Sequence, residues 1–132
     1  MRTTTLALLI AALLFGGMTL FSFGFAAVLF AVIGPDQARL AIRGAFPHYY
    51  LWVIATAVVA SALALATSTM AAWLLIAIAL STVYARQILM HQINAATDAG
   101  NKARFKALHG VSVVIQLFQI GLSGWALALL GG

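Results

Sequence analysis

The chain has 132 residues, of which 64% are hydrophobic and only 7% are charged. Soluble domains are about 45–50% apolar and about 25% charged, and a chain this short buries only part of its surface. The composition therefore excludes a water-soluble fold and predicts an integral membrane protein. No cysteine is present, which excludes disulfides and thiolate metal ligands.

Four apolar runs are long enough to cross a bilayer, which takes roughly 20 helical residues. They predict spans over residues 6–33, 48–66, 70–93 and 107–130. The first run exceeds the roughly 7–15 apolar residues of a signal peptide, so we expect an uncleaved first span. None of the runs alternates apolar and polar residues as barrel strands do. The predicted fold is an all-α integral membrane four-helix bundle, with residues 1–132 as a single transmembrane domain.

The connections between these spans differ in character. Gly34, Pro35 and Asp36 predict the end of span one, with a left-handed glycine, and the start of a short helix. Apolar and basic residues at helical spacing make this helix amphipathic, so we expect it to lie in the headgroup plane. The sequence Phe46-Pro47 is expected to break the chain before span two. The connection at residues 67–69 is very short and predicts a tight antiparallel hairpin.

Basic residues predict the orientation in the membrane. Both longer connections are rich in Lys and Arg, whereas the opposite side carries only Arg2 and the terminal amine. The positive-inside rule places residues 34–47 and 94–106 in the cytoplasm and both termini outside. In a bacterium the membrane would be the inner one. The basic connections are expected to meet anionic headgroups, and no aromatic-interleaved basic patch indicates a nucleic-acid partner.

Polar residues inside the last two spans fall on helix faces. Because polar groups in a span are costly and usually point into the bundle, we expect the two stripes to face each other. They form either interhelical hydrogen bonds or a polar cleft for a ligand. The span-four stripe is His109, Ser112, Gln116, Gln119 and Ser123, and the span-three stripe is Tyr84, Gln87, His91 and Asn94.

Three histidines are predicted near the same membrane side: His48, His91 and His109. Neutral imidazoles from several helices suit a transition metal such as copper, or the axial positions of a haem. Interfacial hydrogen bonding is the simpler interpretation, because the three show no ligand spacing among themselves. Arg86, about two turns inside span three, either reaches towards the headgroups or binds an anionic ligand.

Catalysis finds little support in the sequence. The chain has no Glu, and both Asp residues lie in predicted connections. No Ser-His-Asp constellation, glycine-rich phosphate loop or H-E-x-x-H motif occurs. We therefore favour a role other than that of an enzyme.

Several short segments follow the pattern of one family and together cover most of the chain. They are Leu29-Phe30, Phe46-Pro47-His48-Tyr49, Arg104-Phe105 and Leu108-His109-Gly110-Val111-Ser112. With its Gly/Phe-rich first span, the chain resembles a family of four-span membrane proteins catalogued as a domain of unknown function and related to transmembrane protein 205. The Leu-His-Gly-x-Ser segment is the most specific part of the likeness.

The resemblance implies four spans and a transport or resistance role, because the human relative is associated with resistance to platinum drugs. His109 and Ser112 match the family pattern. Ala27 and His91 stand where proline is commoner, and Gln116 stands where asparagine is commoner, so His91 is particular to this chain.

The leading hypothesis is a small transport or resistance protein that binds a metal-containing or small polar ligand, with possible self-association. The ligand would sit in an inter-helix cleft lined by His109, Ser112, Gln116 and Gln119, with His48 and Arg86 at its mouth. One alternative is a haem-binding membrane oxidoreductase with two histidine ligands. The other is a structural or assembly subunit whose polar stripes pair with a partner or a second copy.

Overall fold

Four long helices run side by side, one from each apolar run. In the computed structural model, which describes residues 2–132, they cover Thr3–Val32, Pro35–Ala64, Thr69–Asp98 and Lys102–Gly131. Each has 30 residues and is therefore about 45 Å long, against a hydrocarbon core of about 30 Å. The helix ends therefore extend into the headgroup region, or the helices tilt. The protein is an all-α membrane helical bundle, as predicted.

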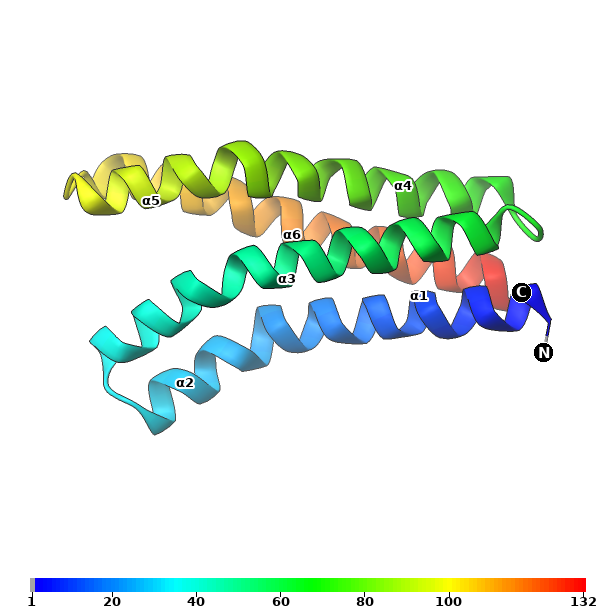
Figure 1. The fold of residues 1–132 in the computed structure, drawn as a ribbon, viewed down its shortest axis with the longest axis horizontal. Helices are drawn as coiled ribbons and strands as arrows, with labels where there is room; N and C mark the ends of the chain where they lie inside the picture. Colours follow the sequence, from blue (N-terminus) through cyan, green and yellow to red (C-terminus); the bar gives the residue numbers. More distant parts are fainter. Residues whose placement is uncertain (1) are drawn as a thin grey trace.

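Two of the four helices contain a π-helical turn. The first comprises α1 (Thr3–Leu20), η1 (Phe21–Phe25, π-helical) and α2 (Ala26–Val32); the second is α3 (Pro35–Ala64). The third comprises α4 (Thr69–Tyr84), η2 (Ala85–Leu89, π-helical) and α5 (Met90–Asp98), and the fourth is α6 (Lys102–Gly131). Figure 1 shows both termini at one end of the bundle and the α2–α3 and α5–α6 connections at the other.

Small side chains occupy the centre of the bundle. Ala7, Ala11, Ala57, Ala60 and Ala71 are completely buried, and they fall at helical spacing along α1, α3 and α4. Small residues let membrane helices approach closely, so that van der Waals packing and interhelical hydrogen bonds hold them together without a hydrophobic driving force. Gly17 has the same role, because a Cβ there would overlap the indole ring of Trp52.

The predicted break at Phe46-Pro47 is wrong. α3 is one continuous helix from Pro35 to Ala64 with Pro47 inside it, so no separate amphipathic helix precedes span two. Proline has no N–H to donate to the carbonyl oxygen of Arg43, but membrane helices tolerate an internal proline because neighbouring groups can satisfy the backbone. Beside it, Arg86 Nε donates a hydrogen bond to the carbonyl oxygen of Pro47 itself at 3.2 Å, which holds the third helix against this part of α3.

The connections are shorter than predicted because the helices continue beyond the apolar runs. The polar segment 94–106 is almost entirely helical, and only residues 99–101 join α5 to α6. Gly100 makes this turn with φ 68°, the left-handed conformation that glycine favours. Gly34 instead has φ −63° and caps α3 in an extended conformation, contrary to the prediction. The predicted tight hairpin is confirmed, because α3 and α4 are separated only by residues 65–68.

The two helical hairpins diverge towards the connection end of the bundle. Figure 1 shows α2 and the start of α3 bending away from α5 and the start of α6. Arg43 on α3 bridges this divergence by an ion pair with Asp98 at the end of α5. The polar groups of the bundle that lie next to this ion pair form the candidate site.

Candidate functional site

A small cavity lies between α3, α5 and α6 at the connection end of the bundle. Its volume is about 60 Å³, enough for a molecule of only a few heavy atoms. Three helices contribute to its wall, so the cavity exists only in the assembled bundle. The residues lining it are Arg43, Phe46 and Tyr50 from α3, Met90, Ile93 and Asn94 from the third helix, and His109 and Ser112 from α6.

Hydrogen-bonding groups of the cavity converge from separate helices. Ser112 is buried on α6, and its hydroxyl neighbours the hydroxyl of Tyr50, which is 4% exposed on α3. His109 lies one turn before Ser112, where its imidazole stacks on Phe105 at a centroid distance of 5.4 Å. Asn94 adds a side-chain amide from α5. The lining therefore offers hydroxyl, amide and imidazole groups around a small volume.

Arg43 is the cation of the cavity, and its partner is Asp98. Nη1 and Nη2 of Arg43 donate to Oδ1 and Oδ2 of Asp98 at 2.7 and 3.0 Å, a bidentate pair. Asp98 lies at the polar end of α5, beyond the apolar run. The hydrogen bond from Arg43 holds the pKa of the Asp98 carboxyl below its usual value. Asp98 is therefore ionised at neutral pH and keeps Arg43 at the cavity.

The other predicted residues of the span-four stripe lie deeper in the bundle. Gln116 does not line the cavity; its amide nitrogen is buried beside the hydroxyl of Tyr49. Gln119 is 4% exposed, and its Nε2 donates to Ser81 Oγ at 2.7 Å and Thr82 Oγ1 at 3.0 Å. The stripe thus divides into a cavity part at His109 and Ser112 and a helix-pairing part at Gln119.

The predicted pairing of the two polar stripes is wrong for most of the span-three stripe. Tyr84, Gln87 and His91 are exposed on the outer surface of the third helix, and only Asn94 reaches the cavity. Ser81 and Thr82 meet Gln119 in their place. The π-helical turn Ala85–Leu89 contains Gln87 and precedes His91 and Asn94, and the extra residue in such a turn changes the helix face on which the later side chains lie.

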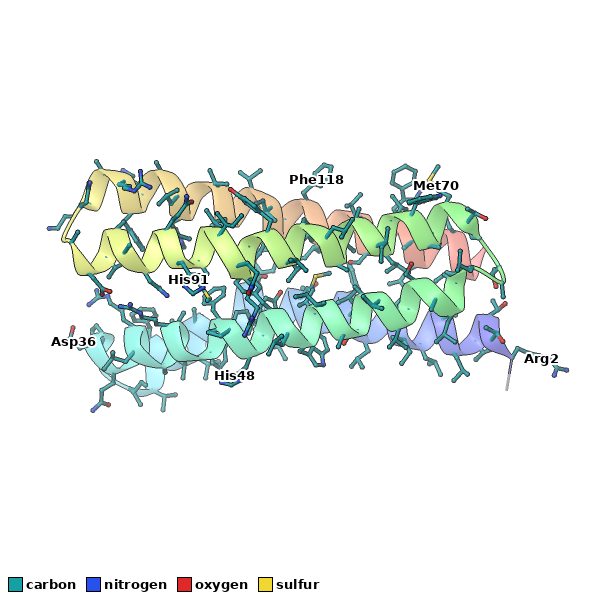
Figure 2. The ribbon with its side chains drawn as sticks, turned by 45° about the horizontal axis from the view of Figure 1, so that its top comes forward. Arg2, Asp36, His48, Met70, His91 and Phe118 are labelled. Atoms are coloured by element: carbon teal, nitrogen blue, oxygen red, sulfur yellow. The ribbon has the colours of Figure 1, made fainter. Side chains whose placement is uncertain are left out.

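His48 and Arg86 are not at the mouth of the cavity. His48 is exposed on α3, where Figure 2 shows it pointing away from the bundle. Arg86 neither extends freely to the headgroups nor faces an open pocket. Besides its bond to Pro47, its Nη1 donates to Gln87 Oε1 at 2.9 Å. Arg86 therefore ties the third helix to α3 at the proline.

The three histidines come from three different helices and are all exposed. Among residues 2–132, no three His, Asp or Glu side chains are grouped so that they could hold a metal ion. Only His109 reaches the cavity. The structure thus does not bring His48, His91 and His109 together.

Sequence reasoning missed two of the polar groups that line the cavity. Arg43 lies in the segment predicted to form an interfacial helix, and Tyr50 was not among the candidate site residues. Asn94 belonged to the predicted span-three stripe but not to the predicted ligand site. The available signal was helical spacing within a continuous α3, because Arg43 and Tyr50 are seven residues apart and share one face.

Four membrane-spanning helices with a polar cavity at one end define a polytopic membrane protein. The chain belongs to the DUF4149 family, described as a domain of unknown function, which it matches over residues 9–102. This range covers the first helix from residue 9 onwards and the whole of the second and third helices, whereas the segment from Leu108 to Ser112 lies beyond it. No curated protein and no solved structure matches the chain.

Proposed function

We propose that this membrane protein binds a small polar or anionic ligand in the cavity between α3, α5 and α6, as part of a transport or resistance function. The observation that carries the proposal is the lining. Arg43, Asn94, His109 and the hydroxyls of Tyr50 and Ser112 gather there from three helices. Most of these groups donate hydrogen bonds. Such a set suits a small anion or an oxygen-rich molecule better than a metal ion, which needs several electron-donating ligands.

The Arg43–Asp98 pair fits a binding role. Asp98 neutralises Arg43 when no ligand is bound, and a small anion that enters the cavity competes with the carboxylate for the same guanidinium. The side chains of Arg43 and Asp98 are both at least partly exposed. Replacing Asp98 by a dissolved anion as the partner of Arg43 therefore requires little desolvation. The resistance role in this proposal comes only from the resemblance of the chain to the family related to transmembrane protein 205.

Filling the cavity is expected to abolish binding. Small anions (chloride, nitrate, formate and phosphate, at matched ionic strength) are added to the protein in nanodiscs, and thermal unfolding is recorded. A ligand at one hundred times its dissociation constant stabilises the folded state by about 2.7 kcal/mol. We expect at least one anion to raise the melting temperature of the unsubstituted chain and to leave Ser112→Phe unaffected.

Val111→Phe is the matched control, because Val111 is the preceding residue of α6 and is 45% exposed on the outer face. It adds a similar side chain without entering the cavity. Equal stabilisation of all three proteins would indicate a general salt effect. Stabilisation of none by any anion would remove the anionic form of the proposal.

The haem alternative has less support. His109 is the one histidine at the cavity, and a second axial ligand would have to come from His48 or His91, which lie on other surfaces. A copper site would need the same rearrangement.

A role as a subunit of a membrane complex is favoured by one specific observation. Tyr84, Gln87 and His91 form an exposed polar stripe on a membrane-spanning helix, and polar side chains facing lipid are costly. A second copy of the chain would cover the stripe. We expect Gln87→Cys, in a chain without other cysteines, to form a disulfide-linked dimer in native membranes under mild oxidation.

Phe118→Cys is the control for this crosslinking, since Phe118 is 68% exposed on α6 and points outwards in Figure 2. If both variants crosslink equally, collision rather than an interface explains the dimers. If Gln87→Cys stays monomeric, the stripe is not covered by a second copy.

We also propose that the connection end faces the cytoplasm. The α2–α3 and α5–α6 connections and most of the basic residues belong to that end (Figure 1), while Arg2 lies at the other (Figure 2). A membrane-impermeant maleimide added outside intact cells is expected to label Ala66→Cys, in the α3–α4 connection, but not Ala99→Cys. The reverse labelling pattern would invert the orientation.

A further inference from the structure

Three buried polar atoms without a hydrogen-bond partner lie together in the bundle. They are Ser22 Oγ on η1, the Tyr49 hydroxyl on α3 and Gln116 Nε2 on α6, and these are all such atoms found among residues 2–132. Ser22 and Gln116 both lie within side-chain reach of the Tyr49 hydroxyl, but none of the three atoms meets the geometry of a direct hydrogen bond to another. Three separate helices thus direct a polar group to one place.

Leaving these atoms unsatisfied is costly. A buried donor or acceptor without a partner costs about 1–3 kcal/mol, and inside a bilayer no solvent is available to reduce that cost. Buried polar groups in native proteins almost always have a partner, either protein or ordered water. Three exceptions that lie next to one another therefore share a single explanation.

Local structure fixes the three groups in this arrangement. The Tyr49 ring stacks on Phe21 at a centroid distance of 3.8 Å and meets Phe46 edge-on, so its hydroxyl cannot swing out to the lipid. Ser22 follows Phe21 in the π-helical turn η1. Such turns rotate side chains away from the regular helical register and occur frequently at functional sites. η1 therefore supplies both the stacking ring and the inward hydroxyl.

We propose that Ser22, Tyr49 and Gln116 form an internal hydration site that holds one or more bound water molecules within the bundle. Two hydroxyls that donate or accept and one amide that donates provide the two to four partners a buried water needs. A charged ligand fits poorly, because Ser22, Tyr49 and Gln116 are all uncharged at neutral pH and burying an unpaired charge is very costly.

The position of the site gives it a consequence for the cavity. Gln116 is one helical turn beyond Ser112, which lines the cavity, and one turn before Gln119. Bound water at Gln116 thus extends the polar interior of the bundle from the cavity towards its middle. This inference stands on the buried atoms alone and does not depend on the cavity binding a ligand.

The test is nuclear magnetic resonance of the unsubstituted protein in nanodiscs, with the glutamine side-chain amides labelled with ¹⁵N. We expect the Gln116 amide protons to show cross-peaks to a long-lived water resonance. Gln119 is an internal control, because its amide is bonded to Ser81 and Thr82 and should show none. Cross-peaks from Gln116 only to the Tyr49 or Ser22 hydroxyl would overturn the proposal, since the three groups would then satisfy one another.

Tyr49→Phe gives a second readout. It keeps the ring and its stacking but removes the hydroxyl, so we expect the water cross-peak of Gln116 to disappear while the spectrum of the folded bundle persists. An unchanged cross-peak in Tyr49→Phe would show that the water does not bind at this site and would equally overturn the proposal.

Discussion

Ala60→Leu is expected to destabilise the bundle strongly, by about 1–3 kcal/mol or more, the range for overpacking a well-packed interior. Ala60 is completely buried on α3, the helix that packs against both α1 and α4. The neighbouring Ser61 hydroxyl donates to the Ala72 carbonyl oxygen of α4 at 2.8 Å. Backbones this close leave no room for three additional carbon atoms, so the helices must separate and lose their packing.

Ala62→Leu is the matched control for this prediction. It makes the same chemical change two residues along α3, at an exposed position, where a leucine side chain simply meets lipid. Thermal unfolding of both variants in the same detergent should show a large loss for Ala60→Leu and almost none for Ala62→Leu. Equal losses would mean that helix propensity or detergent effects, rather than close packing of α3, determine the stability.

Apolar run length was a reliable guide to the helices, because a bilayer fixes the number of residues that a span needs. It was a poor guide to where the helices end. α3 begins at Pro35 and α5 continues to Asp98, in polar segments taken from the sequence to be an interfacial helix and a loop. Backbone hydrogen bonds continue wherever the residues permit a helix, whether or not lipid surrounds them.

Pro47 shows why one local rule failed. In a soluble helix, an internal proline favours a break, but a membrane bundle accommodates one inside a continuous helix. The contact at this point is made by Arg86, 39 residues away in the sequence, which donates to the carbonyl oxygen of Pro47. A contact over that distance depends on the packing of the third helix against α3, and no local pattern contains that information.

The candidate site was predictable on α6 and much less so elsewhere. His109 and Ser112 reach the cavity as expected, because one regular helix keeps its polar face over many residues. The span-three stripe contains the π-helical turn η2, which a count of threes and fours cannot detect. Arg43 lines the cavity and is paired with Asp98. This contact was not predictable, because both residues lie in segments that the sequence indicated to be connections.

Gln119 provides the second large effect, because it is a polar side chain buried near the middle of α6. Gln119→Glu is expected to cost about 3 kcal/mol at neutral pH, the range for an ionised side chain at the centre of a membrane helix. The loss should shrink as the pH is lowered, since a protonated carboxyl carries no charge and donates to Ser81 or Thr82 as the amide does. Thermal unfolding across pH measures both effects.

Gln119→Leu separates the charge from the hydrogen bonds. Ser81 and Thr82 each donate to the Ile78 carbonyl oxygen already, at 3.0 and 2.7 Å, so removing the amide leaves neither hydroxyl hydrogen without a partner. The expected loss is therefore about 1 kcal/mol, typical of one interhelical hydrogen bond in a membrane, and it should not vary with pH. If Gln119→Leu destabilised the bundle as much as Gln119→Glu at every pH, the amide itself would be indispensable to the pairing of α4 and α6.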